Sequence, residues 1–202
     1  MPRMVKYDRD TALQQAVTLF WRQGYSGASM KQIEQALDMR PGSLYAAFGS
    51  KDGLFSEALD RYLGAMFQEM DQHLGQYTSI IEGLKSYLRQ LATSTSSDSS
   101  PPARACMLVK TLLELNDAQT PLQTKINGIF SLIESKFAEV LEEAKRRGEV
   151  SEHLDCGRMA RLLQTQIMGL RSFAQRDVPP EHVTMLAEDL VAMLDSQWHK
   201  QE

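Results

Sequence analysis

The chain has 202 residues, and 43% of them are hydrophobic, which is enough to bury the core of a compact helical unit with a small appended module. Its formal net charge of −4 argues against a protein that coats nucleic acid without selectivity, but it leaves room for a local DNA-reading surface. The N-terminus lacks the apolar run of a secretion signal and no window reaches the length of a membrane span, so we expect a cytoplasmic protein with no membrane partner.

Apolar residues recur at helical spacing along the chain, whereas strand-like alternation is confined to a few residues at a time. The first helix is expected to begin near Asp8 or Asp10 and to end at Gly24. Ser29 followed by Gln32 has the pattern of a capping box, so a second helix is expected to begin there.

Pro41 fits the first position of a short third helix, because its missing N–H is not needed there. Gly49 and Ser50 then end that helix and cap a long fourth one. Further helices are expected at about 80–91, 103–115, 121–147, 155–175 and 181–198, with a flexible loop rich in Ser, Thr and Pro at about 93–102. We therefore predict an all-α protein of about nine helices, with a helix-turn-helix domain at residues 1–52 and a larger helical regulatory and dimerisation domain at 53–202.

The segment 29–51 contains two short helices joined by a tight turn, and the open face of the second helix carries small and hydroxylated side chains. Such a helix suits the major groove of DNA. The residues that carry a resemblance to the TetR family of bacterial one-component regulators are Phe20, Gly24, Tyr25, Ser29, Ile33, Ala36, Gly42, Ser43, Leu44, Tyr45, Phe48, Ser50, Lys51, Leu54 and Phe55. The resemblance is strong over the first quarter of the chain, and the remainder matches in the number and length of helices.

The candidate DNA-binding residues are Ser29, Lys31, Arg40, Pro41, Gly42, Ser43, Tyr45 and Lys51. Gly42 removes a side chain where the protein backbone and DNA must approach closely. Lys51 and Ser29 lie at helix N-termini, which already favour an anion. Arg40 is a poor N-cap and replaces a residue that is frequently Ser in this family, which favours contact with a phosphate or a guanine. The alternatives are a purely structural helix-turn-helix corner, a solvated Lys51 and a packed Tyr45.

The resemblance also implies that a small-molecule inducer binds the larger domain. Candidate lining residues are Met66, Met70, Tyr87, Cys106, Met107, Lys110, Thr111 and Met168. Methionine suits an adaptable apolar pocket, but it suits an ordinary core equally well. Lys110 interrupts an apolar run, and it is expected either to meet an anionic ligand or to pair with an acidic side chain or reach solvent.

The last two helices carry more apolar surface than one core stripe uses, so they are expected to form the interface of a homodimer. Candidate interface residues are Leu162, Gln166, Leu170, Leu190, Met193 and Leu194; the alternative is that they all belong to the core of one chain. The two cysteines, Cys106 and Cys156, are far apart in sequence, and neither belongs to a metal-ligand pair such as Cys-x-x-Cys. Arg104 and Lys110 are close enough in sequence to lower the pKa of Cys106 and make it reactive.

These observations predict a ligand-responsive DNA-binding transcriptional regulator, a homodimeric repressor that a small-molecule inducer releases from its operator. Two alternatives remain open: a repressor that senses electrophiles or oxidants through Cys106, and a helical adaptor that binds protein. No cofactor or metal is expected. An enzyme is disfavoured, because the sequence has no Gly-rich phosphate loop, His-Glu-x-x-His pair or Gly-x-Ser-x-Gly elbow. The inducer, the operator, the target genes and the choice between repression and activation are left open.

Overall fold

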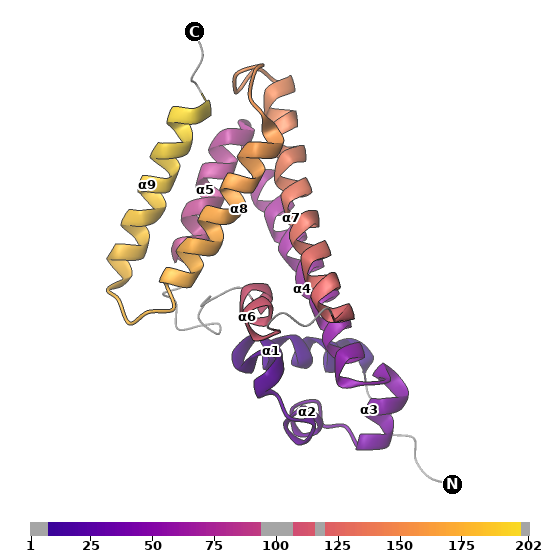
Figure 1. The fold of residues 1–202 in the computed structure, drawn as a ribbon. Coiled ribbons are helices and arrows are strands. Elements are labelled where there is room, and N and C mark those ends of the chain that lie inside the picture. Colours follow the sequence, from indigo (N-terminus) through magenta and orange to yellow (C-terminus); the bar gives the residue numbers. More distant parts are fainter. Residues whose placement is uncertain (1–7, 94–106, 116–119, 199–202) are drawn as a thin grey trace. The chain divides into compact units, whose positions relative to one another are not determined.

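The computed structural model describes residues 8–93, 107–115 and 120–198 (Figure 1). Within these ranges the regular elements are nine α-helices without a strand, which confirms the predicted all-α fold. The helices are α1 (Arg9–Gly27), α2 (Met30–Ala36), α3 (Pro41–Phe48), α4 (Lys51–Leu74), α5 (Ile80–Thr93), α6 (Met107–Glu114), α7 (Pro121–Arg146), α8 (Cys156–Phe173) and α9 (Pro180–Trp198). None of these described helices is long and apolar enough to cross a membrane.

The chain forms two compact units that interleave along the sequence. Unit 1 takes residues 1–67 and 107–126, so it contains α1 to α3, most of α4, α6 and the start of α7. Unit 2 takes residues 68–106 and 127–202, and therefore contains α5, most of α7, α8 and α9. The assignment of α6 to unit 1 reflects its packing against α1. The functional boundary between residues 52 and 53 stays a prediction.

The core of unit 1 is built around an aromatic pair. Phe20 of α1 and Phe55 of α4 are fully buried, and their rings meet edge to face with centroids 4.7 Å apart. Ile33 of α2 and Leu44 and Phe48 of α3 complete this core. Each large apolar side chain buried in this way contributes about 1.5–3 kcal/mol of transfer free energy. The two short helices are therefore held by packing, because helices of this length are marginal on their own.

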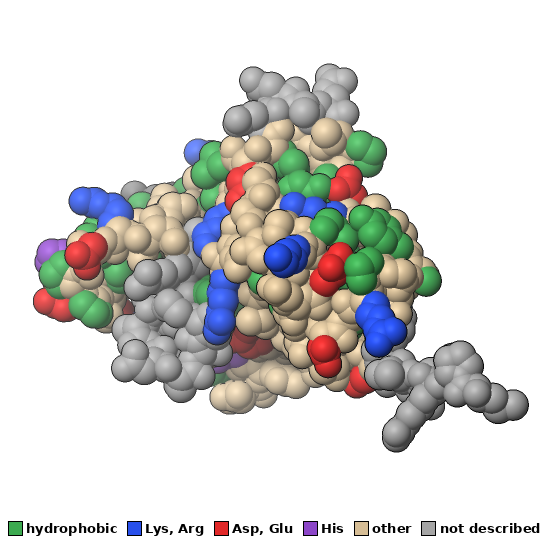
Figure 2. Space-filling view, turned by 90° about the horizontal axis from the view of Figure 1, so that it is seen from below, with side chains coloured by type: hydrophobic (Ala, Val, Ile, Leu, Met, Phe, Trp, Pro, Cys, Tyr) green, Lys and Arg blue, Asp and Glu red, His purple; other side chains and the backbone are tan. Residues whose placement is uncertain are grey.

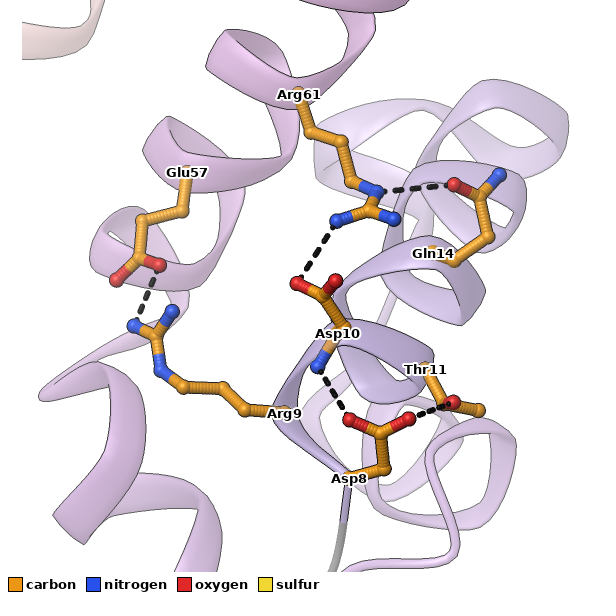
Figure 3. Close-up of polar contacts among 7 residues, drawn as sticks. All are labelled: Asp8, Arg9, Asp10, Thr11, Gln14, Glu57 and Arg61. Atoms are coloured by element: carbon orange, nitrogen blue, oxygen red, sulfur yellow. Dashed lines mark hydrogen bonds and ion pairs between the residues drawn. The ribbon is translucent and has the colours of Figure 1, made fainter.

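The N-terminus of α1 is fastened to α4 by polar contacts (Figure 3). Arg9 Nη2 lies 2.6 Å from Glu57 Oε2, and Arg61 Nη1 lies 3.1 Å from Asp10 Oδ1. Asp8 caps the helix, as predicted, by accepting hydrogen bonds from the Asp10 N–H at 3.1 Å and the Thr11 hydroxyl at 2.6 Å. The Thr11 hydrogen bond is the main reason that the pKa of Asp8 lies below its usual value.

The other end of α1 differs from the prediction. Gly24 has φ 76° and ψ 176°, so it breaks the helix, but the chain resumes a helical path and α1 continues to Gly27. Glycine tolerates this positive φ at little cost, whereas other L-residues are strained there. The signal that the sequence offered as a helix end is therefore a break within the helix.

Unit 2 is organised around the packing of α5, α8 and α9, whose ribbons lie next to one another in Figure 1. Leu170 of α8 and Val183 and Ala187 of α9 form a buried cluster. Arg89 of α5 pairs with Glu188 of α9, with Nε 2.8 Å from Oε1. These contacts fix the last two helices within their own unit.

A carboxylate from outside α5 holds the start of that helix. Glu149, just after α7, accepts hydrogen bonds from the Ser79 hydroxyl at 2.7 Å and the Ile81 N–H at 3.0 Å. Burial works to raise the pKa of Glu149, but these hydrogen bonds outweigh it and the pKa is lowered. The carboxylate therefore stabilises unit 2 in its ionised form.

Candidate DNA-binding surface

The α2–turn–α3 segment begins with the predicted capping box. The Ser29 N–H donates to Gln32 Oε1 at 2.9 Å, and the Gln32 N–H donates to Ser29 Oγ at 3.3 Å. In the turn, Asp38 takes a left-handed φ of 48°, a conformation that Asp tolerates better than most residues. The buried Met39 then leads the chain into α3. Residues close in sequence therefore determine where both short helices begin.

The third helix has two distinct faces. Leu44 and Phe48 point into the core, with 3% and 6% of their surface exposed. Tyr45 is 51% exposed, and its neighbour Ala46 is also exposed. Pro41 occupies the first helical position, as predicted, and Arg40 is the N-cap residue but makes no side-chain capping bond. The outward face of α3 therefore offers Arg40, Pro41, Gly42, Ser43, Tyr45 and Ala46 to a partner.

Gly42 has no packing reason to be a glycine. It is exposed, its φ lies outside the left-handed region, and a Cβ added to it would meet no atom of the described chain within 4 Å. Glycine in a helix costs about 0.5–1 kcal/mol relative to alanine. This cost, with no gain inside the chain, fits the expectation that something outside the protein approaches the backbone here.

The junction between α3 and α4 is tightly packed. Gly49 has φ 74° and ends α3, and Ser50 Oγ accepts a hydrogen bond from the Gly53 N–H at 3.0 Å. A Cβ on Gly53 would lie 2.1 Å from the carbonyl oxygen of Phe48, so a side chain there would force the two helices apart. The start of α4 is thereby held directly against the end of α3.

Lys51, the first residue of α4, is half-buried and lies against an aromatic ring. Its Nζ is 4.4 Å from the centroid of Tyr25, whose hydroxyl donates a hydrogen bond to Asp52. Burial lowers the pKa of Lys51, while the charges of Asp52 and Glu114 oppose that effect. Burial and the Asp52 contact raise the pKa of Tyr25 to about 12. Sequence reasoning identified Lys51 but missed the roles of Tyr25 and Asp52, which the packing of α1 on α4 creates.

Figure 2 is a view from below Figure 1, and the face that it shows has Lys and Arg side chains interspersed with acidic and apolar ones. Two of the cations of unit 1, Arg9 and Arg61, are already paired with carboxylates. Lys31 and Arg40 are exposed. This mixture of charges is more typical of a surface that binds selected DNA sequences than of a uniformly basic patch.

The candidate inducer-binding residues fall into both units. Met66, Met107, Lys110 and Thr111 belong to unit 1, whereas Met70, Tyr87 and Met168 belong to unit 2, and Cys106 lies outside the described residues. Thr111 is buried and donates its hydroxyl to the Met107 carbonyl oxygen at 2.9 Å. Lys110 donates to the carbonyl oxygen of Trp21 at 3.3 Å, a partner that sequence reasoning did not consider.

The candidate dimer residues also divide into two groups. Leu170, Leu190 and Leu194 are buried within this chain, while Leu162, Gln166 and Met193 retain surface. The exposed apolar surface of α9 includes Met185, which sequence reasoning missed and which is 62% exposed, together with Leu186. The sequence signal for Met185 was an apolar side chain directly before Leu186, on a side of the helix that is otherwise polar.

Cys156 begins α8 and is buried. Burial is the main reason that its pKa is raised to about 11, with a hydrogen bond to Glu142 and the charge of that carboxylate acting in the same direction. The thiol is therefore protonated at neutral pH, so the position at a helix N-terminus does not produce a reactive thiolate here. Among the described residues there is no group of three or more His, Cys, Asp or Glu side chains that could hold a metal ion.

An exposed short helix, positioned by a capped partner helix on a compact helical base, defines a helix-turn-helix DNA-binding protein. Comparisons with known proteins give the family. Residues 12–58 match the family model of the bacterial regulatory proteins of the tetR family, and residues 81–187 match that of the tetracyclin repressor-like C-terminal domain. The chain belongs to the TetR family, and it is a DNA-binding transcriptional regulator.

Individual relatives agree with this assignment. The chain is 26% identical to the HTH-type transcriptional repressor ComR of Escherichia coli over 182 residues, covering 90% of this chain and 86% of ComR. It is 33% identical to the TetR family regulator CifR, solved as a cysteine mutant with a 26-bp double-strand operator DNA, with a TM-score of 0.81 over 95% of this chain and 98% of that one. The reduced form of NemR of Escherichia coli, at 17% identity and a TM-score of 0.79, shares the fold.

Proposed function

We propose that the protein is a homodimeric transcriptional repressor that binds operator DNA through α3 and leaves it when a small-molecule inducer binds. The observation that carries the proposal is the outward face of α3, where Arg40, Ser43 and Tyr45 are exposed on a helix whose other face is buried. CifR, a relative of similar length and fold, has been solved with operator DNA, and ComR is named a repressor. The protein accordingly acts on DNA in the cytoplasm.

In the proposed complex α3 lies in the major groove with its N-terminal end toward the bases. Arg40 binds either a phosphate or the O6 and N7 atoms of a guanine, and Ser43 hydrogen-bonds a base edge or a phosphate. Tyr45 binds a phosphate through its exposed hydroxyl. Ser29, Lys31 and Lys51 add phosphate contacts from the N-terminal ends of α2 and α4, where backbone dipoles favour an anion. Pro41 and Gly42 keep the start of α3 free of bulk, so the backbone approaches the DNA closely.

Two copies are needed, because one short recognition helix reads few bases. The exposed Met185, Leu186 and Met193 on α9 and the half-buried Leu162 on α8 supply apolar surface for a two-fold interface between subunits, and the half-buried Gln166 on α8 adds a polar group to it. The other candidates, Leu170, Leu190 and Leu194, are buried within this chain and leave little surface for such an interface. Half-sites in the operator are then spaced by about 34 Å, one helical turn, or a multiple of it.

The regulatory step takes place in the larger domain, which we place at residues 53–202, with the DNA-reading domain at 1–52. Met70 and Tyr87 are buried in unit 2 and Met168 is half-buried there, so these residues are the first candidates for an apolar inducer site. An inducer releases DNA only if it binds the DNA-free conformation more tightly than the DNA-bound one. The adaptor alternative has no specific observation in its favour.

The test is a DNA-binding titration with purified protein and a fluorescent fragment of the DNA upstream of its own gene, at several salt concentrations. The proposal expects a salt-sensitive complex of two protomers that weakens when Arg40 or Lys51 is replaced by alanine. A matched control is Lys125→Ala, which removes a cation of α7 that is paired with Asp60. If neither this fragment nor any duplex selected from a random pool is bound at low salt, the proposed function is wrong.

A further inference from the structure

The break in α1 at Gly24 frees backbone groups on both of its sides. A helix ends with carbonyl oxygens that have no partner and begins with N–H groups that have none. Gly24 divides α1 into a long first part, whose last turn contains Trp21, and a short second part that contains Tyr25 and Ser26.

Two side chains of α6, one helical turn apart, bind these two ends. Lys110 Nζ donates to the Trp21 carbonyl oxygen at 3.3 Å, and lies 5.8 Å from the centroid of the Trp21 ring. Glu114 Oε2 accepts a hydrogen bond from the Ser26 N–H at 2.8 Å. The cation therefore binds a carbonyl oxygen before the break, and the anion binds an N–H after it. All four residues belong to unit 1.

Gly24 is shaped to receive the carboxylate. A Cβ added at position 24 would lie 2.0 Å from Glu114 Oε1, and the φ of 76° already disfavours any side chain there. Gly24 is also buried, so the carboxylate lies against bare backbone. The glycine therefore serves the contact with α6 as well as the break itself.

The residue that follows Gly24 leads to the DNA-binding surface. Tyr25 packs against Phe55, with ring centroids 5.0 Å apart, and carries Lys51 Nζ over its ring. Its hydroxyl also donates to Asp52 at the start of α4. A shift of the backbone at residues 24–26 thus moves the support on which Lys51 rests.

We propose that Glu114 is a positioning residue for DNA binding: its hydrogen bond to the Ser26 N–H holds the broken end of α1 so that Tyr25 presents Lys51 to a phosphate. This inference rests on the proposed function, because it assigns Lys51 to the DNA. Glu114 itself is an anion near the binding surface, so its charge alone opposes DNA binding. If Glu114 positions Lys51, removing its carboxylate weakens DNA binding. If only its charge matters, removing the carboxylate strengthens DNA binding.

The experiment measures affinity for a duplex that the wild-type protein selects from a random pool, at fixed salt. We expect Glu114→Ala to weaken binding about five- to tenfold, because a charge-assisted hydrogen bond to backbone is lost. Glu114→Gln keeps an acceptor oxygen and is expected to restore most of the affinity. Glu114→Asp keeps the charge but shortens the side chain, so it is expected to weaken binding and serves if the alanine variant does not fold. Glu139→Ala, which removes an exposed carboxylate from α7, is the control and is expected to bind as the wild type does.

A double-mutant cycle separates positioning from a general loss of structure. In a Lys51→Ala background the effect of Glu114→Ala is expected to shrink to less than about twofold, because the residue acts through Lys51. The inference is overturned if Glu114→Ala binds as tightly as the wild type or more tightly, if the glutamine variant is as weak as the alanine variant, or if the two losses simply add. Absence of DNA binding by the wild-type protein overturns the proposed function and this inference together.

Discussion

Replacing Gly42 with alanine is expected to stabilise the protein and weaken its binding to DNA. The added methyl group meets no atom of the described chain within 4 Å, and the backbone at this position has no positive φ that alanine would resist. Alanine is favoured over glycine within a helix by about 0.5–1 kcal/mol. Because 1 kcal/mol corresponds to about 2–4 °C in Tm for a domain of 150–250 residues, Tm is expected to rise by about 1–4 °C.

The affinity of the Gly42→Ala variant for DNA is expected to fall. If the start of α3 approaches the DNA within van der Waals distance, one methyl group at Gly42 holds the helix away and lengthens the hydrogen bonds of Arg40 and Ser43. We expect a loss of at least about tenfold in affinity, which equals about 1.4 kcal/mol. Thus the same substitution is favourable in the free protein and unfavourable in the complex.

Gly128→Ala is the matched control. Gly128 lies in the middle of α7, is exposed, and also has no atom within 4 Å of an added Cβ. It is expected to raise Tm by a similar amount and to leave DNA affinity unchanged. Tm is followed by circular dichroism and affinity by fluorescence anisotropy at one salt concentration. A Gly42→Ala variant that gains stability and binds DNA like the wild type would refute the proposed close approach.

Four further outcomes follow from individual contacts. Ser29→Ala removes one half of the capping box and is expected to lower the free energy of unfolding by about 1 kcal/mol in a urea titration; no change would show that the Gln32 side chain caps α2 alone. Lys51→Ala is expected to reduce the slope of log K against log salt by about 0.9, the value for one phosphate contact, and an unchanged slope would remove Lys51 from the interface. Cys156 is expected to react with a maleimide at pH 7 only after denaturation, because its pKa is raised to about 11 in the folded protein. The thiolate is therefore favoured in the unfolded chain, so the free energy of unfolding is expected to fall as the pH rises above 9. The Cys156→Ala variant is expected to lack this fall. Glu149 has a lowered pKa, so its stabilisation is present above the usual value of 4.5 and is lost as the pH falls through the lowered value; Glu149→Gln is expected to flatten the acid limb of the stability curve, and an unaltered limb would exclude the carboxylate as its cause.

The elements that sequence reasoning placed correctly are those whose signals are local. The capping box at Ser29 and the proline at the first position of α3 both act within one helical turn, so their consequences can be derived from neighbours in the chain. The two faces of α3 follow from the spacing of Leu44 and Phe48. The exposed residues of that helix were therefore predictable as a surface, although the bases they contact are not.

The α8 and α9 residues show where a pattern of apolar residues stops being informative. Leu170 and Met193 have equally apolar side chains, yet the first is buried against Val183 and Ala187 and the second retains 40% of its surface. Periodicity indicates that a residue lies on an apolar face, but it does not say whether that face is covered by the same chain or by a second copy. Here the packing of α8 against α9 covers Leu170 and leaves Met193 with exposed surface.

The contacts of α6 with the break in α1 could not be predicted from the sequence. A glycine after an apolar stripe is a common sign of a helix end, and at Gly24 the helix is interrupted although α1 resumes after it. What the sequence does not contain is the partner, because Lys110 is 89 residues from Trp21 and Glu114 is 88 residues from Ser26. Sequence reasoning considered an anionic ligand, an acidic side chain or solvent as the partner of Lys110, whereas the structure also gives it a carbonyl oxygen. A helix break that no neighbour in sequence caps therefore leaves backbone groups for a distant segment to bind, and the segment that binds them becomes coupled to whatever the broken helix supports.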